Sequence, residues 1–279
     1  MRTVSADLIT STVESLCLEA NTRLDRRVED FIRKASKREK SRLGKRAFSD
    51  IFKNMEISRK TGLPLCQDTG LDIVFLDIGR DVRIRGNIYD AVNRGVKRGY
   101  RKGYLRKSIV RCPLRRTNTG DNRPAIVHTR FVSGSRIKVT LMPKGGGAEN
   151  VSMLRMLKPT TSRDQIKDIV VRWVEDVACY ACPPIFVGIG MGGSFDTVCL
   201  LAKEALLRTP GQANRDRYYA KLEEDILKEI NNSGIGPQGL GGSVTALDVR
   251  IEARPCHIAS LPLAINLQCH AQRYKSRMI

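Results

Sequence analysis

The amino-acid sequence alternates between helix-like and strand-like segments, and glycine-rich stretches separate several of them. Residues 162–180 give the clearest helix, because apolar side chains recur every three to four positions and Ser162 can cap the first turn with Gln165 behind it. Further helices are expected at 5–21, 23–38, 45–60, 88–101, 194–207 and 213–232. Strands are expected at 71–77, 82–85, 125–132, 136–142, 185–189, 245–252 and 258–265.

This order of segments favours a mixed α/β (α+β) fold, with helices packed on mixed, largely antiparallel sheets. The runs 125–132 and 136–142 flank a Ser-Gly-Ser turn and predict a β-hairpin. No internal repeat, low-complexity linker or clear boundary interrupts the chain. We therefore expect a single domain over residues 1–279, with a mainly helical N-terminal part at 1–62. A doubly wound parallel sheet is disfavoured.

The composition indicates a globular cytoplasmic protein. The chain has 279 residues, of which 41% are hydrophobic, enough for a substantial core. It has no run of about 18 apolar residues, so no membrane span is expected. The N-terminus lacks the apolar core of a secretory signal, which favours a cytoplasmic location.

The formal net charge of +20 suggests nucleic-acid binding at first sight. Basic residues crowd the stretches 22–46 and 94–116. However, aromatic residues for base stacking make up only 5% of the chain, the first basic stretch is interleaved with acidic residues, and no known nucleic-acid motif is present. We therefore disfavour a nucleic-acid partner. The charge can instead attract small dianionic substrates, attract an acidic partner subunit, or cover a solvated surface.

Three of the eight cysteines lie in unusually specified surroundings. They are Cys66 in Pro-Leu-Cys-Gln-Asp-Thr-Gly, Cys182 in Ala-Cys-Pro-Pro and Cys269 in Leu-Gln-Cys-His. In a cytoplasmic chain such cysteines are more typical of metal ligands than of disulfides. Three thiolates can hold a [4Fe–4S] cluster and leave one iron open to bind a substrate as a Lewis acid. Cys179 and Cys182 also form a Cys-x-x-Cys pair, which alone would suggest zinc or a redox pair; we interpret Cys179 as a packing residue.

Several other residues have both a functional and a structural interpretation. Asp68 lies two positions after Cys66, where it can be a general acid or base or can simply close an Asx turn. His257 is one of three histidines and can face a substrate or be structural. Arg106 and Arg116 are candidates for binding a carboxylate through two parallel N–H donors.

The glycine-rich stretch 188–194 is expected to form a close backbone turn between a strand and a helix, beside the proposed cluster. Such a loop can bind a phosphate at a helix N-terminus. Its glycine spacing does not fit the dinucleotide-binding pattern in a useful register, so we disfavour that function. His270, which follows Cys269 directly, is interpreted as structural.

Taken together, these motifs resemble the α subunit, or N-terminal half, of the iron–sulfur-dependent hydro-lyases typified by class I fumarate hydratase, a group that includes tartrate dehydratase and mesaconase-type enzymes. The matching segments follow the family order along nearly the whole chain. They are Pro-Leu-Cys-Gln-Asp-Thr-Gly (64–70), Asn-Thr-Gly-Asp-Asn (118–122), Lys-Gly-Gly-Gly-Ala-Glu-Asn (144–150), Ala-Cys-Pro-Pro (181–184), Gly-Met-Gly-Gly-Ser (190–194), Ile-Gly-Pro-Gln-Gly-Leu-Gly-Gly (235–242) and the segment from His257 to His270.

The resemblance implies the fold of an iron–sulfur hydro-lyase α subunit and a specific set of site residues. It implies that Cys66, Cys182 and Cys269 bind a [4Fe–4S] cluster that keeps one iron open. It also implies the following substrate contacts: Gln67 and Asp68 face the substrate, with Asp68 in proton transfer, Arg106 binds a substrate carboxylate, His257 lies at the substrate, and Gly146 offers its backbone amide.

The resemblance further implies a partner and a reaction. The family's second half carries further arginines, a lysine and the catalytic base, and this chain stops at Ile279, about where that half would begin. We therefore expect a separate β subunit and a heterotetramer of two α and two β chains. The predicted reaction on a small dicarboxylate is the interconversion of malate and fumarate, which two segments favour: Gly-Gly-Gly-Ala-Glu-Asn and His-Ile-Ala-Ser-Leu-Pro.

Three alternatives stay open. The first is a tartrate or mesaconate-type dehydratase α subunit, because one hydroxyl group separates malate from tartrate. The second, from another class, is a basic nucleic-acid-binding protein with a structural metal site. The third is an assembly subunit that has lost catalysis.

Overall fold

The computed structural model describes residues 1–279, and the chain divides into two compact units. Unit 1 consists of Met1–Asp25, Lys53–Gly146 and Arg273–Ile279. Unit 2 consists of Arg26–Phe52 and Gly147–Gln272. None of the helices combines the length and the apolar character that crossing a membrane requires.

Unit 1 contains a four-stranded sheet with the strand order β10-β5-β2-β4 and a parallel pair, β1-β3. Its strands are β1 (Arg2–Ser5), β2 (Leu71–Gly79), β3 (Val82–Arg85), β4 (Ile126–Val132), β5 (Ile137–Lys144) and β10 (Lys275–Met278). Its helices are α1 (Ala6–Thr22) and α4 (Ile88–Lys102), together with the C-terminal part of α3 (Arg42–Thr61). The predicted mixture of helices and sheets is confirmed.

The predicted hairpin between β4 and β5 is wrong. Both strands pair with β2, which lies between them: β4 is parallel to it and β5 antiparallel. Strand β2 is buried along most of its length, from Asp72 to Leu76. A strand with so many apolar residues is most stable in the centre of a sheet, where both of its edges are hydrogen-bonded and both faces are covered.

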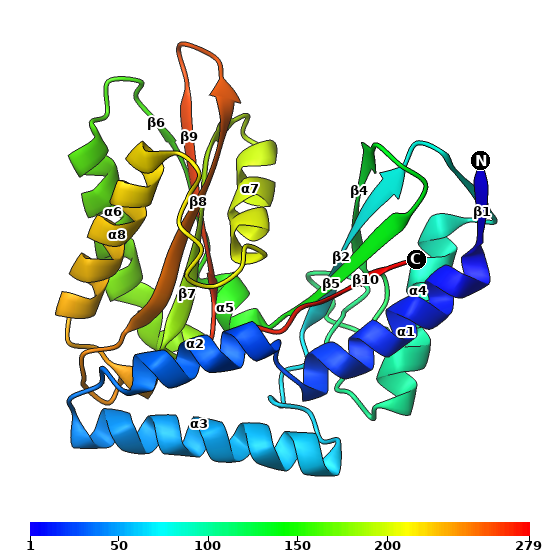
Figure 1. Ribbon diagram of the computed structural model, residues 1–279, viewed down its shortest axis with the longest axis horizontal. Helices are drawn as coiled ribbons and strands as arrows, with labels where there is room; N and C mark the ends of the chain where they lie inside the picture. Colours follow the sequence, from blue (N-terminus) through cyan, green and yellow to red (C-terminus); the bar gives the residue numbers. More distant parts are fainter. The chain divides into compact units, whose positions relative to one another are not determined.

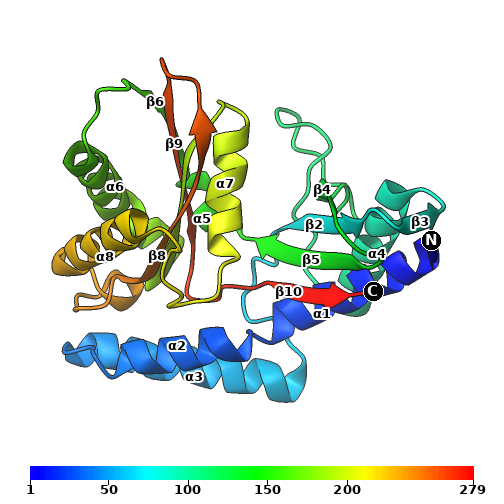
Figure 2. The same cartoon turned by 45° about the horizontal axis from the view of Figure 1, so that its top comes forward.

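Helices α1 and α4 pack closely against one another and cover one face of this sheet (Figures 1 and 2). The close approach depends on glycines in α4. A Cβ atom at Gly95 would lie 2.6 Å from Val13 Cβ, and one at Gly99 would lie 2.7 Å from Cys17 Cβ. From the sequence alone these glycines lower the helix propensity of the segment, but in the structure they are the positions at which the neighbouring helix makes contact.

Unit 2 contains the second four-stranded sheet, with the order β6-β9-β7-β8. Its strands are β6 (Met153–Leu157), β7 (Ile185–Gly193), β8 (Ala246–Cys256) and β9 (Leu261–Gln268). Its helices are α2 (Arg26–Ser36), the first part of α3, α6 (Arg163–Val177), α7 (Thr197–Leu206) and α8 (Arg217–Asn232), with α5 (Gly146–Asn150) at its start and short 3₁₀ turns η1 (Ala178–Ala181) and η2 (Pro237–Gly239). Figure 1 shows α6 and α8 on one face of the sheet and α7 on the other. The predicted capping box of α6, between Ser162 and Gln165, is present.

The predicted turn at 188–194 is wrong, because β7 continues through it to Gly193. Side chains alternate along this strand. Val187 and Ile189 enter the main apolar core, whereas Gly188 and Gly190 face α7. A side chain at Gly190 would collide with the carbonyl oxygen of Val198 in that helix. The glycines therefore allow a helix to lie close to the sheet and do not form a ligand loop.

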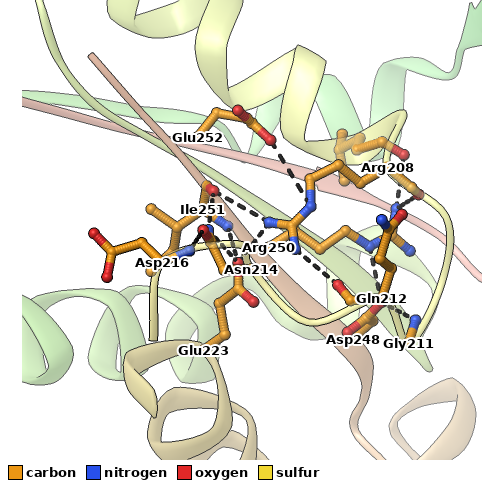
Figure 3. A network of polar contacts seen from close by, with 11 residues as sticks. Arg208, Gly211, Gln212, Asn214, Asp216, Glu223, Asp248, Arg250, Ile251 and Glu252 are labelled. Atoms are coloured by element: carbon orange, nitrogen blue, oxygen red, sulfur yellow. Dashed lines mark hydrogen bonds and ion pairs between the residues drawn. The ribbon is translucent and has the colours of Figure 1, made fainter. Parts of the chain in front are cut away.

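A buried network of charges connects the segment after α7 to β8 and α8 (Figure 3). Arg250 on β8 has only 1% of its side chain exposed, and it donates to Asp248 Oδ2 at 2.8 Å and to the Leu206 carbonyl at 2.9 Å. Arg208 binds Glu223 of α8 at 2.6 Å. Such buried charges are tolerated because each one has a partner of opposite charge and further hydrogen bonds.

Candidate active site

Unit 2 places Cys182 and Cys269 at the same end of its sheet. Cys182 lies three residues before the first residue of β7, and Cys269 follows the last residue of β9. The two strands are antiparallel neighbours, and Phe186 of β7 is paired with Gln268 of β9. The start of β7 and the end of β9 therefore meet at the same end of the sheet.

Contacts among three of the sequence motifs fix the backbone around Cys182. The residue adopts a left-handed conformation (φ 54°, ψ 71°), which costs a non-glycine residue roughly 1 kcal/mol or more and needs support from its surroundings. His270 Nδ1 lies 3.1 Å from the Cys182 carbonyl oxygen. Nδ1 also lies 3.3 Å from Gln238 Nε2, so it donates to the carbonyl in one tautomer and accepts from the amide in the other. Gln238 donates to the Pro183 carbonyl through both its backbone N–H and its side chain, at 2.7 Å each.

The segment after Cys269 is also fixed. The thiol of Cys269 lies 3.8 Å from the Ala271 carbonyl oxygen. Gln272 is fully buried, accepts from the Arg250 guanidinium at 3.4 Å and donates to the Leu206 carbonyl. Arg250, which belongs to the charged network, therefore also holds the chain three residues beyond Cys269.

Unit 1 holds the Asp68 side chain by two backbone donors. Asp68 Oδ1 accepts from Gly70 N–H at 3.0 Å, which is the Asx turn considered from the sequence. Oδ2 accepts from Gly146 N–H at 2.6 Å. Next to Asp68, Cys66 is half-buried and Gln67 is exposed. The amide of Gly146, which the resemblance assigns to the substrate, is thus used by Asp68 in this structure.

Arg106 lies in the same unit and is connected to Asp68 through Thr69. The Thr69 hydroxyl donates to the Arg106 carbonyl oxygen at 2.7 Å. The Arg106 side chain is exposed, and its guanidinium has no hydrogen-bond or ion-pair partner. Arg116 is exposed too, and its guanidinium donates to the carbonyl of nearby Pro113 at 3.4 Å. Arg106 is therefore the better placed of the two candidates for a carboxylate ligand.

The structure does not bring His257 together with Cys182 and Cys269 within unit 2. His257 follows β8 directly, and Cys256 at the end of β8 is paired with Gly193 at the far end of β7. Strand β7 has 9 residues. At about 3.3 Å per residue, its two ends are roughly 26 Å apart. The His257 side chain is exposed, and its Nδ1 accepts from Ala259 N–H at 3.1 Å.

None of the eight cysteines forms a disulfide, and within neither unit do three His, Cys, Asp or Glu side chains gather closely enough to hold a metal ion.

Thr69 and Asn122 are two buried polar residues near Asp68 that were not recognised as site residues from the sequence. Asn122 lies in the Asn-Thr-Gly-Asp-Asn segment, which was the available signal. The amide of Gln268, 1% exposed and adjacent to Cys269, has no hydrogen-bond partner.

Unit 2 has two cysteines outside disulfides at one end of its sheet, which are suited to binding a metal group. Unit 1 has a carboxylate held by backbone amides and an unpaired arginine, and the arginine is suited to binding a small anion. The family comparison makes the assignment specific. The chain matches the family model described as Fumarate hydratase (Fumerase) over residues 10–277, and it belongs to that family. The resemblance to class I fumarate hydratase is confirmed.

Relatives with assigned names show the same class. A protein of Methanocaldococcus jannaschii named "Putative L(+)-tartrate dehydratase subunit alpha" is 42% identical over 272 residues, which cover 95% of each chain. The protein named "L(+)-tartrate dehydratase subunit alpha" from Escherichia coli K12 is 27% identical over 269 residues, covering 95% of this chain and 88% of the relative. The chain is a hydro-lyase α subunit of the class I fumarase type, and both of these relatives are named as tartrate dehydratase α subunits.

Proposed function

We propose that this chain is the α subunit of an L(+)-tartrate dehydratase-type hydro-lyase, which works with a β subunit to remove water from a hydroxy dicarboxylate. The observation that carries this proposal is the 42% identity to a relative of that name over 95% of both chains. Fumarate hydratase, with malate as the substrate, is the second candidate, because the family model has that description. A mesaconate-type substrate is the third.

We propose that Cys66, Cys182 and Cys269 would hold a [4Fe–4S] cluster. Thiolates are the ligands that iron–sulfur clusters require, whereas magnesium and calcium prefer oxygen. All three cysteines lie outside disulfides, and two of them share one end of a sheet. When bound, a cluster with one open iron supplies a Lewis acid for the substrate hydroxyl group.

The protein's own side chains would bind and orient the substrate. The Arg106 guanidinium can bind a carboxylate through two parallel N–H donors. Gln67, next to Asp68 in the sequence, is exposed and can donate to a second oxygen. The two backbone amides that hold Asp68 orient its carboxylate, so that its remaining lone pairs can take up or return a proton.

His257 needs a second copy of the chain if it acts at the proposed cluster. Within unit 2 it lies at the opposite end of the sheet from Cys182 and Cys269. We propose that His257 from a second α chain reaches the site, which agrees with the expected assembly of two α and two β subunits.

The decisive experiment is to purify the αβ complex without oxygen and to assay L(+)-tartrate, malate and citramalate side by side. We expect about four irons per α chain, loss of activity in air and recovery with ferrous iron and a thiol. We also expect kcat/KM for tartrate to exceed that for malate by at least about tenfold, because a site that hydrogen-bonds a substrate hydroxyl discriminates against an analogue that lacks it. Faster turnover of malate would support fumarate hydratase instead. A colourless zinc protein with salt-dependent affinity for RNA would remove the proposal.

A further inference from the structure

The Asn-Thr-Gly-Asp-Asn segment runs antiparallel to the segment that follows Arg106. An isolated bridge pairs Val110 with Asn118. Three hydrogen bonds extend it: Arg111 N–H to Thr117 O at 2.8 Å, Thr119 N–H to Ile109 O at 2.9 Å and Asn118 Nδ2 to Lys107 O at 2.9 Å. The backbone after Arg106 is therefore attached to this segment and not to a helix or a sheet of unit 1.

Asn122, at the end of this segment, connects the Arg106 side to the Asp68 side. It is fully buried. Its Oδ1 accepts from Ser108 N–H at 2.7 Å, and its Nδ2 donates to the Gly70 carbonyl at 3.1 Å. Ser108 lies two residues after Arg106, and Gly70 lies two residues after Asp68. One buried amide group thus bridges the two segments that carry the proposed substrate contacts.

Thr69 forms a second bridge between the same two segments. Its side chain is buried, with 1% exposed, and its hydroxyl donates to the Arg106 carbonyl at 2.7 Å. The Tyr100 hydroxyl holds the same turn from α4, since it lies 2.9 Å from the Thr69 carbonyl and 3.2 Å from the Gly70 carbonyl. The turn that orients Asp68 therefore also sets the position of the Arg106 backbone.

We propose that Thr69 and Asn122 are positioning residues that fix the separation between Arg106 and Asp68, and so select a substrate whose carboxylate lies at a set distance from the carbon that loses its proton. This inference rests on the proposed function. The Arg106 side chain has no partner of its own, so only its backbone anchors determine where the guanidinium can reach. Misplacing a binding group by about 1 Å can cost an enzyme roughly 10²-fold in rate.

The test measures equilibrium binding of succinate, a dicarboxylate without a hydroxyl group, to the intact αβ complex by calorimetry. Thr69→Val removes the hydroxyl at nearly constant volume, and we expect its Kd for succinate to rise about tenfold. Thr69→Ser keeps the hydroxyl and should retain the wild-type Kd. Thr61→Val is the matched control, because the exposed Thr61 hydroxyl donates to Ile57 O and accepts from Leu63 N–H at 3.2 Å but contacts neither Asp68 nor Arg106, and it should also retain the wild-type Kd.

A double-mutant cycle shows whether Thr69 acts through Arg106. In an Arg106→Ala background, Thr69→Val should cause no further loss of succinate affinity, whereas a general structural defect would add its full effect. Asn122→Ala provides the same comparison if Thr69→Val does not fold, as judged by thermal unfolding. The proposal would be overturned if Thr69→Val kept the wild-type affinity for succinate or if Thr69→Ser lost it. Additive losses of affinity in the double-mutant cycle would overturn it as well. A wild-type complex that binds succinate but dehydrates no hydroxy acid would remove the proposed function, and the positioning would still be decided by the Kd values.

Discussion

Asp72 is a buried carboxyl group that the proposed chemistry does not use. It has 1% of its surface exposed, and neither of its carboxylate oxygens has a hydrogen-bond partner. Tyr100 and Asn122 lie close to it but donate to backbone carbonyls instead. Burial raises the pKa of Asp72 to about 7, against the opposing effect of the positive charge on Arg273. The folded chain therefore keeps this proton at pH values where the unfolded chain has lost it.

This proton makes stability depend on pH. Between about pH 4 and pH 7, Asp72 is protonated in the folded state and ionised in the unfolded state, so its contribution to the free energy of unfolding should fall as the pH rises, by up to about 4 kcal/mol. Asp72→Asn should remove that fall, whereas Asp81→Asn, at an exposed position, should not. Urea unfolding of the isolated chain at a series of pH values measures the slope. Parallel slopes for wild type and Asp72→Asn would contradict the argument.

Individual residues could be recognised from the sequence only where a motif surrounds them. The specified surroundings of Cys66, Cys182 and Cys269 drew attention to them, and so did the spacing of Asp68. The structure contains the Asx turn at Asp68 but adds the contact with Gly146, which lies 78 residues away. Contacts over such distances leave no local pattern, and for the same reason Thr69 was passed over.

At the scale of elements, the charged network at Arg250 should be a major source of stability. Arg250→Met removes the donor to Asp248, to two backbone carbonyls and to Gln272. Leaving a buried charge without its partner costs about 3–5 kcal/mol, so the thermal midpoint should fall steeply. Arg277→Met breaks a half-exposed ion pair with Glu19 and should cost less than about 1 kcal/mol. Similar losses in the two variants, compared by chemical unfolding, would show that the network contributes little.

Helices and strands could be predicted from periodicity far better than their partners. The predicted helices at 5–21 and 88–101 match α1 and α4 within one residue at each end. The pairing of β4 and β5 with β2 could not be predicted. A short Ser-Gly-Ser turn can connect two strands that pair directly, and it can equally connect two strands that lie on either side of a third. Likewise, a glycine that allows a turn and one that makes room for a helix look the same in a sequence, as in β7.

At the scale of the whole molecule, the position of His257 predicts complementation between inactive variants. A complex with Cys182→Ser and a complex with His257→Asn should each be inactive. When both α chains are expressed together with β, a mixed pair combines an intact cysteine set from one chain with an intact histidine from the other. Random pairing then restores roughly a quarter of the wild-type sites. Failure of the mixed preparation to recover activity would place His257 in its own chain's site or outside it.

The path of the chain through the two units could not be predicted from the sequence. Unit 1 takes its last strand from the C-terminus, where β10 pairs antiparallel with β5. This strand has 4 residues, mostly polar, and carries no alternating apolar pattern. Its place is set by the edge of β5, which needs a hydrogen-bonding partner.

The close packing of α1 on α4 means that smaller side chains are tolerated on the α1 side of the contact, whereas larger ones are not tolerated on the α4 side. Val13 and Cys17 can lose atoms at the cost of a small cavity, but Gly95 and Gly99 cannot gain even a methyl group without separating the helices. Alanine would strengthen an isolated α4 by about 1 kcal/mol at each position. Replacing these glycines by alanine, a simple way to stabilise a helix, is therefore not open to this protein. Glycine should persist at both positions in any thermostable descendant.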